Sequence, residues 1–342
     1  MPELSPRQVD LAVNIAVGPK WLTQTADTLD SIEHYLAAEC DIAVVVVDDS
    51  GEDDTAAMLQ QRSGKRFVVL RREKPFMFKR NIHATCLGYD YVVKHFQPKL
   101  VMKIDTDALI TGYGLFRDAI EFHMQNPNVG IFGKHLTNPD GSIKSYKMHT
   151  DLLAGELHPS NLRGRVKLMI GRGPWYLPIV RRAQRNGWGL GENVFGGGYF
   201  MTPDCLSALS ANGYLTPSNE KWHGRLQVED VYFTMCAVAS GFSPGHFAAP
   251  WGPLAMLWQS LPFPAREIHE RGYKFIHSVD KGRNTSREEN NGLTVREYFK
   301  KVREAEATDG RVPQVSILRA GSQSPAIRPR SPSPSCPPAK GV

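Results

Sequence analysis

The chain has 342 residues, of which 41% are hydrophobic and 22% charged, and its formal net charge at pH 7 is +6. This length and apolar content are sufficient for a complete α/β core. Residues 311–342 contain five basic residues and no acid, so the rest of the chain carries only +1, which argues against nucleic-acid binding by the folded part.

The first elements in chain order predict a βαβ unit. Residues 11–17 and 42–47 are apolar, β-branched runs of strand length, and apolar side chains recur between them at helical spacing. A third strand is expected over 67–70, a helix over 80–93 and a further strand that ends at Asp105. This pattern is typical of an α/β fold with parallel strands.

Acidic residues follow two of the expected strands. Asp48 and Asp49 follow the second expected strand, residues 42–47. Asp105 ends the fourth expected strand, and Asp107 comes two residues later. In open α/β sheets ligands bind at the carboxyl ends of the strands. A pair of carboxylates at such a position suits Mg²⁺ or Mn²⁺, which completes its coordination with water and phosphate oxygens. An acidic turn that caps the next helix is the simpler alternative.

Two later segments also have unusual composition. Three consecutive glycines at 196–198 predict either a tight bend or a backbone that comes very close to a ligand. Glu229 and Asp230 open a helix expected over 231–240, which ends before Gly241. Acids at a helix N-terminus are favoured by the helix dipole, whatever else they do.

Taken together, residues 44–54, 79–92, 103–110, 196–209 and 228–242 resemble the ordered motifs of the GT-A glycosyltransferases. The first two resemble the large inverting group that builds polysaccharides, and the last two are similar to the β-1,3-galactosyltransferase-like group. The resemblance covers roughly residues 11–279. It implies a Rossmann-like, mixed and mainly parallel sheet flanked by helices in a single domain.

The resemblance also implies roles for the metal and nucleotide. Asp107 would bind Mn²⁺ or Mg²⁺, Asp105 would reach the metal or the ribose, and His277 would be a third ligand. Asp48 or Asp49 would contact the nucleobase or ribose, and which of the two does so stays open.

For the sugar and the chemistry, the family pattern points to other residues. Arg80 would reach the base or the diphosphate, unless it is a solvated charge in a basic segment. Gly197 and Gly198 would lie under the donor sugar. Asp230 would be the base that deprotonates the acceptor, with Glu229 orienting the acceptor or a neighbouring group. Attack by the acceptor itself implies inversion at the anomeric carbon.

The expected function is therefore a metal-dependent, inverting hexosyltransferase, of the kind used in polysaccharide biosynthesis. It would use a nucleotide-sugar donor, with UDP favoured by the resemblance, and a carbohydrate or lipid-linked acceptor. Two alternatives stay open. One is a catalytically silent nucleotide-sugar-binding or scaffold protein. The other is a sugar nucleotidyltransferase, which is more distant because no glycine-rich, Arg-containing loop follows Val17.

Acceptor recognition has two candidate segments. Trp251, Trp258 and Phe263 lie among four prolines, and tryptophan faces either stack on sugar rings or fill a core. Residues 163–188 interleave basic and aromatic side chains, which suits an anionic acceptor, a lipid diphosphate or a membrane surface, or is a solvated basic face over buried aromatics.

The C-terminal part predicts the domain boundary. Thr294 and Glu297 form a capping-box pattern for a final helix that runs to about residue 307. We expect one catalytic domain over 1–310 and a disordered tail rich in Pro, Ser and Arg over 311–342. Five scattered cysteines without a CxxC pair, no leader-like segment and no apolar run of about 20 residues predict a cytoplasmic protein, with peripheral membrane contact left open.

Overall fold

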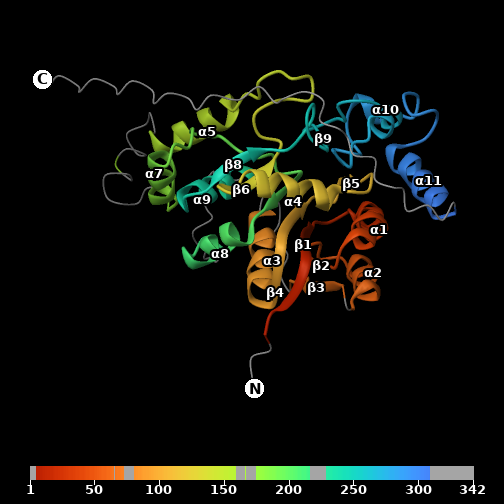
Figure 1. The fold of residues 1–342 in the computed structure, drawn as a ribbon, viewed down its shortest axis with the longest axis horizontal. Helices are drawn as coiled ribbons and strands as arrows, with labels where there is room; N and C mark the ends of the chain where they lie inside the picture. Colours follow the sequence, from red (N-terminus) through yellow and green to blue (C-terminus); the bar gives the residue numbers. More distant parts are fainter. Residues whose placement is uncertain are drawn as a thin grey trace, which may run out of the picture.

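The computed structural model describes residues 5–64, 66–72, 81–158, 166, 175–215 and 229–308. Its main element is a seven-stranded sheet with the order β3-β2-β1-β4-β7-β6-β8 (Figure 1). Strand β7 is antiparallel to both of its neighbours, and every other pair in this sheet is parallel. The predicted mixed, mainly parallel sheet is confirmed.

The strands of this sheet and their bounds are β1 (Arg7–Val17), β2 (Ile42–Asp48), β3 (Phe67–Arg71), β4 (Phe96–Ile104), β6 (Val129–Gly133), β7 (Gly198–Met201) and β8 (Ser243–His246). The helices are α1 (Leu22–Glu39), α2 (Asp53–Arg62), α3 (Asn81–His95), α4 (Leu115–Gln125), α5 (Lys147–Leu157), α7 (Leu177–Arg185), α8 (Pro203–Ala211), α9 (Glu229–Ala239), α10 (Ala265–Glu270) and α11 (Val295–Thr308).

Helices cover both faces of the parallel strands. Alternate residues of β1 divide between two hydrophobic clusters, with Ala12 in one and Leu11 and Val13 in the other. Helices α3, α8 and α9 cover the first face and α1 and α2 the second, as Figure 1 shows for α3, α8, α1 and α2. Burial on both faces explains why β2 is an unbroken apolar run whose seven residues are all buried.

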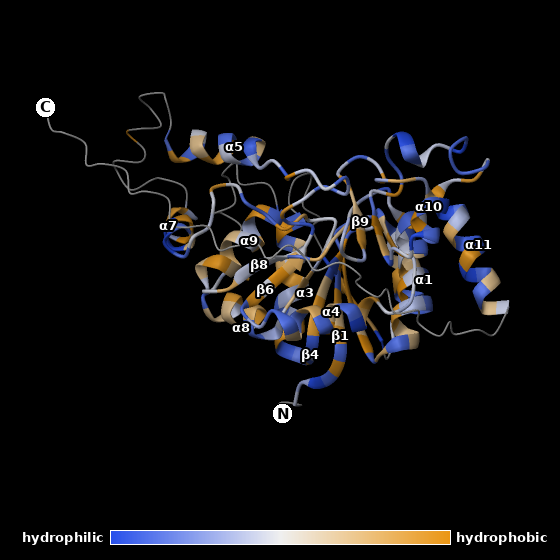
Figure 2. Cartoon of the chain, turned by 45° about the horizontal axis from the view of Figure 1, so that its top comes forward, coloured by the Kyte–Doolittle hydropathy of each residue, from blue (hydrophilic) through white to orange (hydrophobic). Residues whose placement is uncertain are grey.

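The outer helices are amphipathic. In Figure 2 helix α11 carries hydrophobic and hydrophilic residues side by side. Val295 and Phe299 are buried on its inner face and Lys300 is exposed. The predicted capping box opens this helix, since Thr294 N–H donates to Glu297 (2.7 Å) and Glu297 N–H donates to the Thr294 hydroxyl (3.1 Å).

A second, three-stranded sheet places a late segment beside an early one. It has the order β5-β10-β9 and consists of β5 (Ala108–Ile110), β9 (Leu254–Met256) and β10 (Phe275–His277). Strand β10 runs antiparallel to β5, with His277 opposite Ala108. This pairing sets His277 next to the residues that end β4.

The predicted elements agree with the observed ones apart from their ends. Strands β1 and β4 start several residues earlier than their apolar runs suggest, and α9 ends before Gly241, whose φ is +97°. Arg80 and residues 311–342, including the predicted tail, lie outside the described residues. Within the described part of the chain, no helix is both long and apolar enough to cross a lipid bilayer. Four of the five cysteines are described, and each is a free thiol.

Candidate active site

Four chain segments meet beyond the end of β4. They are residues 105–107 after β4, the glycine segment 195–198 before β7, the first turn of α9, and β10. The amide of Asp105 donates to the Gly197 carbonyl (3.2 Å), which joins the first two segments. The sheet edge therefore gathers most of the residues that the sequence singled out.

Asp105, Asp107 and His277 form a cluster that suits a metal ion. Their ligand atoms all lie within 4.8 Å of one another. His277 Nε2 is 3.0 Å from Asp107 Oδ1 and 3.9 Å from Asp105 Oδ2. Two carboxylates and one imidazole are a donor set that Mn²⁺ accepts, and Mg²⁺ would use the carboxylates.

The hydrogen bond on the far side of the imidazole supports this interpretation. His277 Nδ1 lies 3.0 Å from the Leu257 carbonyl, which can only accept, so Nδ1 carries the proton. In the neutral ring Nε2 is then a lone pair that faces the Asp107 carboxylate. Orientation of a ligand histidine by a carbonyl is the usual second-shell arrangement at metal sites.

Asp107 is buried and surrounded by donors. The hydroxyl of Ser278 donates to its Oδ2 (3.1 Å), and the Lys281 ammonium also lies 3.0 Å from Oδ2. Burial raises the pKa of Asp107, but His277, when both of its ring nitrogens are protonated, and Lys281 outweigh burial and hold it well below its usual range. Asp107 is therefore an anion in the folded protein.

The glycine segment is required by the side chains packed against it. A Cβ on Gly197 would lie 2.5 Å from the ring of His277, and one on Gly198 would lie 2.2 Å from that of Phe275. Neither residue is among those with positive φ. Close approach of the His277 and Phe275 rings to the backbone thus explains these two glycines. Whether a donor sugar also lies on this segment stays a prediction.

Glu229 is enclosed by donors. Lys103 (2.9 Å), Asn81 (2.8 Å) and the Tyr199 hydroxyl (3.1 Å) all reach its carboxylate. Burial raises the pKa of Glu229, and the Lys103 ammonium opposes this shift. A carboxylate engaged in this way is suited to holding neighbouring groups in place.

Lys103 is a site residue that the sequence analysis missed. Lys103 lies in β4 and is 1% exposed. Its ammonium contacts Asp105 (2.5 Å), Glu229 (2.9 Å) and the Gly196 carbonyl (2.5 Å). The sequence feature that could have identified it is a single lysine inside the apolar run LVMKI, residues 100–104. Lys103 ties the end of β4 to the first turn of α9 and to the glycine segment.

Asp230 is the next residue of α9 and is also buried. One of its carboxylate oxygens accepts from the Val231 amide (2.9 Å). A Cβ on Gly196 would lie 3.3 Å from the Cβ of Asp230. The predicted base therefore packs against the same segment as His277.

Asp48 and Asp49 lie at the end of β2, which is separated from β4 by β1. Asp48 is 1% exposed, and its Oδ1 accepts from the amide (3.0 Å) and the hydroxyl (2.6 Å) of Ser50. Asp49 forms an ion pair with Arg72 (3.3 Å). Both acids thus lie at the predicted sheet edge, two strands away from the metal cluster.

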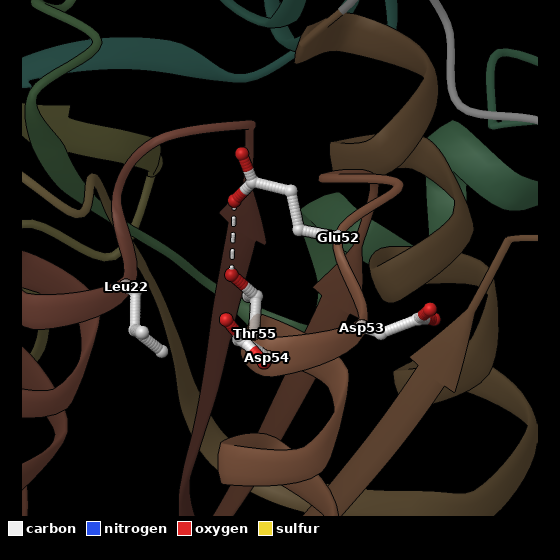
Figure 3. Close-up of a pocket in the computed structure, with 5 residues that line it drawn as sticks. All are labelled: Leu22, Glu52, Asp53, Asp54 and Thr55. Carbon is white, nitrogen blue, oxygen red and sulfur yellow. Dashed lines mark hydrogen bonds between the residues drawn. The ribbon is translucent and has the colours of Figure 1, made fainter.

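A shallow pocket opens just beyond them (Figure 3). It is lined by Leu22, Glu52, Asp53, Asp54 and Thr55, and the Thr55 hydroxyl donates to Glu52 (3.1 Å). Three carboxylates would repel a diphosphate. None of the predicted site residues lines this pocket, so we assign the chemistry to the cluster at β4 and β10.

The two candidate acceptor segments differ in exposure. Trp251 and Trp258 are 58% and 65% exposed, which leaves their faces available for stacking. Of the described residues in 163–188, Tyr176 and Trp188 are buried while Arg181, Arg182 and Arg185 are exposed. That part of the segment is a solvated basic face over buried aromatics.

Comparison with known proteins adds little to this geometry. No family model matches the sequence, and no curated protein matches it. Among solved structures the chain is similar to mannosyltransferase PcManGT from Pyrobaculum calidifontis in complex with GDP-Man and Mn²⁺ (TM-score 0.40, 12% identity, 72% of this chain and 58% of that chain). It is also similar to S. aureus TarS 1-349 in complex with UDP (TM-score 0.40, 15% identity, 70% and 59%) and with UDP-GlcNAc (0.39, 14%, 70% and 57%).

The chain thus spans less than two thirds of the length of these structures. Their superposition on this chain is too loose to support any conclusion about activity. The proposal below rests on the residues of the site itself.

Proposed function

We propose that this protein is a metal-dependent glycosyltransferase that uses a nucleotide-sugar donor. The observation that carries the proposal is the cluster of Asp105, Asp107 and His277 on one side of the glycine segment, with the buried carboxylate of Asp230 packed against the same segment. When bound by the cluster, Mn²⁺ or Mg²⁺ supplies positive charge for a diphosphate leaving group.

The assigned roles follow the chemistry of transfer. Asp230 accepts the proton of an acceptor hydroxyl. The hydroxyl oxygen bonds to the anomeric carbon as the bond from that carbon to the diphosphate oxygen breaks, and the nucleoside diphosphate leaves with the bonding electrons. Attack by the acceptor on the face opposite the leaving group inverts the anomeric carbon.

The remaining residues hold this arrangement. Glu229 and Lys103 fix the first turn of α9 against β4, so Glu229 acts as a positioning residue. Asp48 or Asp49 contacts the nucleobase or ribose, and Arg80 the base or diphosphate. The preference for UDP rests on the family resemblance, and the acceptor is a carbohydrate or a lipid-linked glycan.

Calorimetry with UDP, GDP and dTDP, in Mn²⁺ and then in EDTA, tests the proposal on the full chain. We expect one nucleotide to bind in Mn²⁺ only, and the Asp107→Asn variant to lose at least tenfold in affinity. Asp30→Asn is the matched control, because Asp30 is a half-exposed acid of α1 that pairs with Arg62. Absence of binding to the wild type, or equal affinity in EDTA, would contradict the proposal.

A further inference from the structure

Two lysines contact the ring of Phe195 and have no carboxylate partner among the described residues. Lys134 follows β6, and Lys144 lies on the returning arm of a hairpin, where its amide donates to the Leu136 carbonyl (2.9 Å). Both ammonium groups lie over the ring of Phe195, at 5.5 Å and 5.8 Å from its centroid. The two side chains therefore converge on one aromatic ring.

The described groups in direct contact with these two ammonium groups carry no charge. Lys134 is 5% exposed, and its ammonium makes no hydrogen bond or ion pair with any described residue. Lys144 donates only to neutral oxygens, the carbonyl (2.9 Å) and the side-chain oxygen (2.6 Å) of Asn193. Lys134 is buried and Lys144 is half-buried. A cation withdrawn from water without an anionic partner costs free energy, and an anionic ligand would relieve that cost.

The pKa values agree with this geometry. Burial lowers the pKa of Lys134 to about 8, opposed only by the exposed Asp140. Burial lowers that of Lys144 to about 7, where the neighbouring charge of Lys134 adds to the effect and those of Asp230 and Glu192 oppose it. An anion between the two ammonium groups would reverse both shifts.

The other titratable groups that face this pair do not neutralise it. Glu192 is engaged by His135 (2.9 Å). His149 and His246 have pKa values lowered by burial, and the lysine charges lower them further, although Asp230 opposes this at His149. Neither imidazole offers a negative charge.

The lysine pair is also linked to the reacting centre. Phe195 packs against the ring of His277 (5.3 Å between centroids), and the next residue, Gly196, packs against Asp230. Asp230 lies near enough to Lys144 for its charge to act on the pKa of that lysine. The four-residue glycine segment 195–198 thus connects the lysine pair, the base and the metal cluster.

We propose that Lys134 and Lys144 bind an anionic group of the acceptor, a carboxylate or a phosphate, and so place an acceptor hydroxyl at Asp230. This inference rests on the proposed function. The donor diphosphate has the metal cluster to compensate its charge, whereas Lys144 lies near enough to Asp230 to respond to the charge of the base. The acceptor class is therefore a sugar that carries a negative charge near the hydroxyl that attacks.

Ligand-observed NMR on the full chain, saturated with UDP and Mg²⁺, tests this with probes matched except for charge. Methyl β-glucuronide is compared with methyl β-glucoside for the carboxylate, and glucose 6-phosphate with glucose for the phosphate. We expect at least one charged probe to bind more than fivefold tighter than its neutral counterpart. The pair that shows the preference tells a carboxylate from a phosphate.

Lys134→Met and Lys144→Met should each reduce that preference to about one, and Lys134→Arg should retain it. Lys147→Met is the matched control, because Lys147 lies three residues from Lys144 but is exposed and paired with Asp151 (2.6 Å). Thermal melting of each variant verifies that it is folded.

The inference is overturned if neither charged probe is preferred by the wild type, or if Lys147→Met abolishes the preference as fully as the other two changes. It is also overturned if Lys134→Met weakens UDP binding as much as probe binding, since the lysines would then serve the donor. Failure of UDP, GDP and dTDP alike to bind the wild type would contradict the proposed function instead, and a charge preference measured without nucleotide would still support the lysine site.

Discussion

Lys103 and Lys134 are buried and Lys144 is half-buried near the glycine segment, but the partners of the three differ. The Lys103 ammonium lies between the carboxylates of Asp105 and Glu229. Lys134 and Lys144 meet an aromatic ring and neutral oxygens. In the described part of the chain, the first environment contains the opposite charges that it needs, and the second has no carboxylate in direct contact with either ammonium.

The pKa values of these lysines express the same difference. Burial acts to lower the pKa of Lys103, yet its two carboxylate partners outweigh burial and raise it above the ordinary value. Burial prevails at Lys134 and Lys144, with pKa values of about 8 and about 7. Lys103 therefore helps to hold the fold together. Lys134 and Lys144 reduce the stability of the free protein and are available to bind an anion.

The largest expected effect is at Asp230, which lies near both environments. Asp230→Asn should lower kcat by about 10²- to 10⁴-fold, because an amide cannot accept the proton of the acceptor. Nucleotide affinity in Mn²⁺ should stay within about twofold, since the metal cluster is intact. Release of nucleoside diphosphate with the preferred charged acceptor measures the rate. A loss of less than tenfold would remove Asp230 as the base.

Lys103→Met tests the complete environment. Removal of the ammonium leaves the buried Glu229 and the half-buried Asp105 close together without compensation, and this should destabilise the fold by about 3–5 kcal/mol. Urea denaturation measures the change. The double variant with Glu229→Gln should recover part of the loss, because one uncompensated carboxylate is then gone. A loss below about 1 kcal/mol would contradict a framework role.

Gly197→Ala tests the segment that joins the two environments. Its Cβ would lie 2.5 Å from the ring of His277, so the ring must move, at a cost of about 1–3 kcal/mol. The displaced imidazole should weaken Mn²⁺-dependent nucleotide binding. Gly196→Ala is the control with a milder contact of 3.3 Å to Asp230. Equal nucleotide affinity in both variants would argue that His277 is not a ligand.

Of these variants, Lys134→Met should change the stability of the protein least, and the change should be opposite in sign to that of Lys103→Met. Removal of an unpaired buried cation should stabilise the free protein by about 1–2 kcal/mol below pH 8. The pKa of Lys134 falls from its ordinary value of 10.5 to about 8 on folding, so between these values the unfolded chain binds more protons and the wild type gains stability as pH rises. The advantage of the variant should therefore shrink from pH 8 to 10.5 in urea titrations.

The fold was largely readable from the sequence because its parallel strands are buried on both faces. Burial of this kind selects continuous β-branched runs such as Val44 to Val47, which cannot be mistaken for an amphipathic helix. The strand ends were less readable. Residues such as Arg7 and Gln97 extend the hydrogen-bonded ladders beyond the apolar runs without changing the pattern.

The candidate site was readable only where a local pattern marks it. Asp105 and Asp107 follow a buried strand, and Glu229 and Asp230 open an apolar helix. His277 entered through family resemblance, since a lone histidine has no local signal. The pairing of β10 with β5 brings it to Asp107 across 170 residues of sequence.

By itself, the sequence determined the order of the elements, the sheet edge at which acids collect, and the carboxylates suited to a metal. These follow from local periodicity and from the rule that parallel strands end at one edge. Tertiary structure alone decided which charges are compensated. Lys103 lies within an apolar strand pattern and Lys134 directly follows one. The segments that pack around them, α9 for the first and Phe195 for the second, determine that Lys103 has carboxylate partners and that Lys134 has none among the described residues.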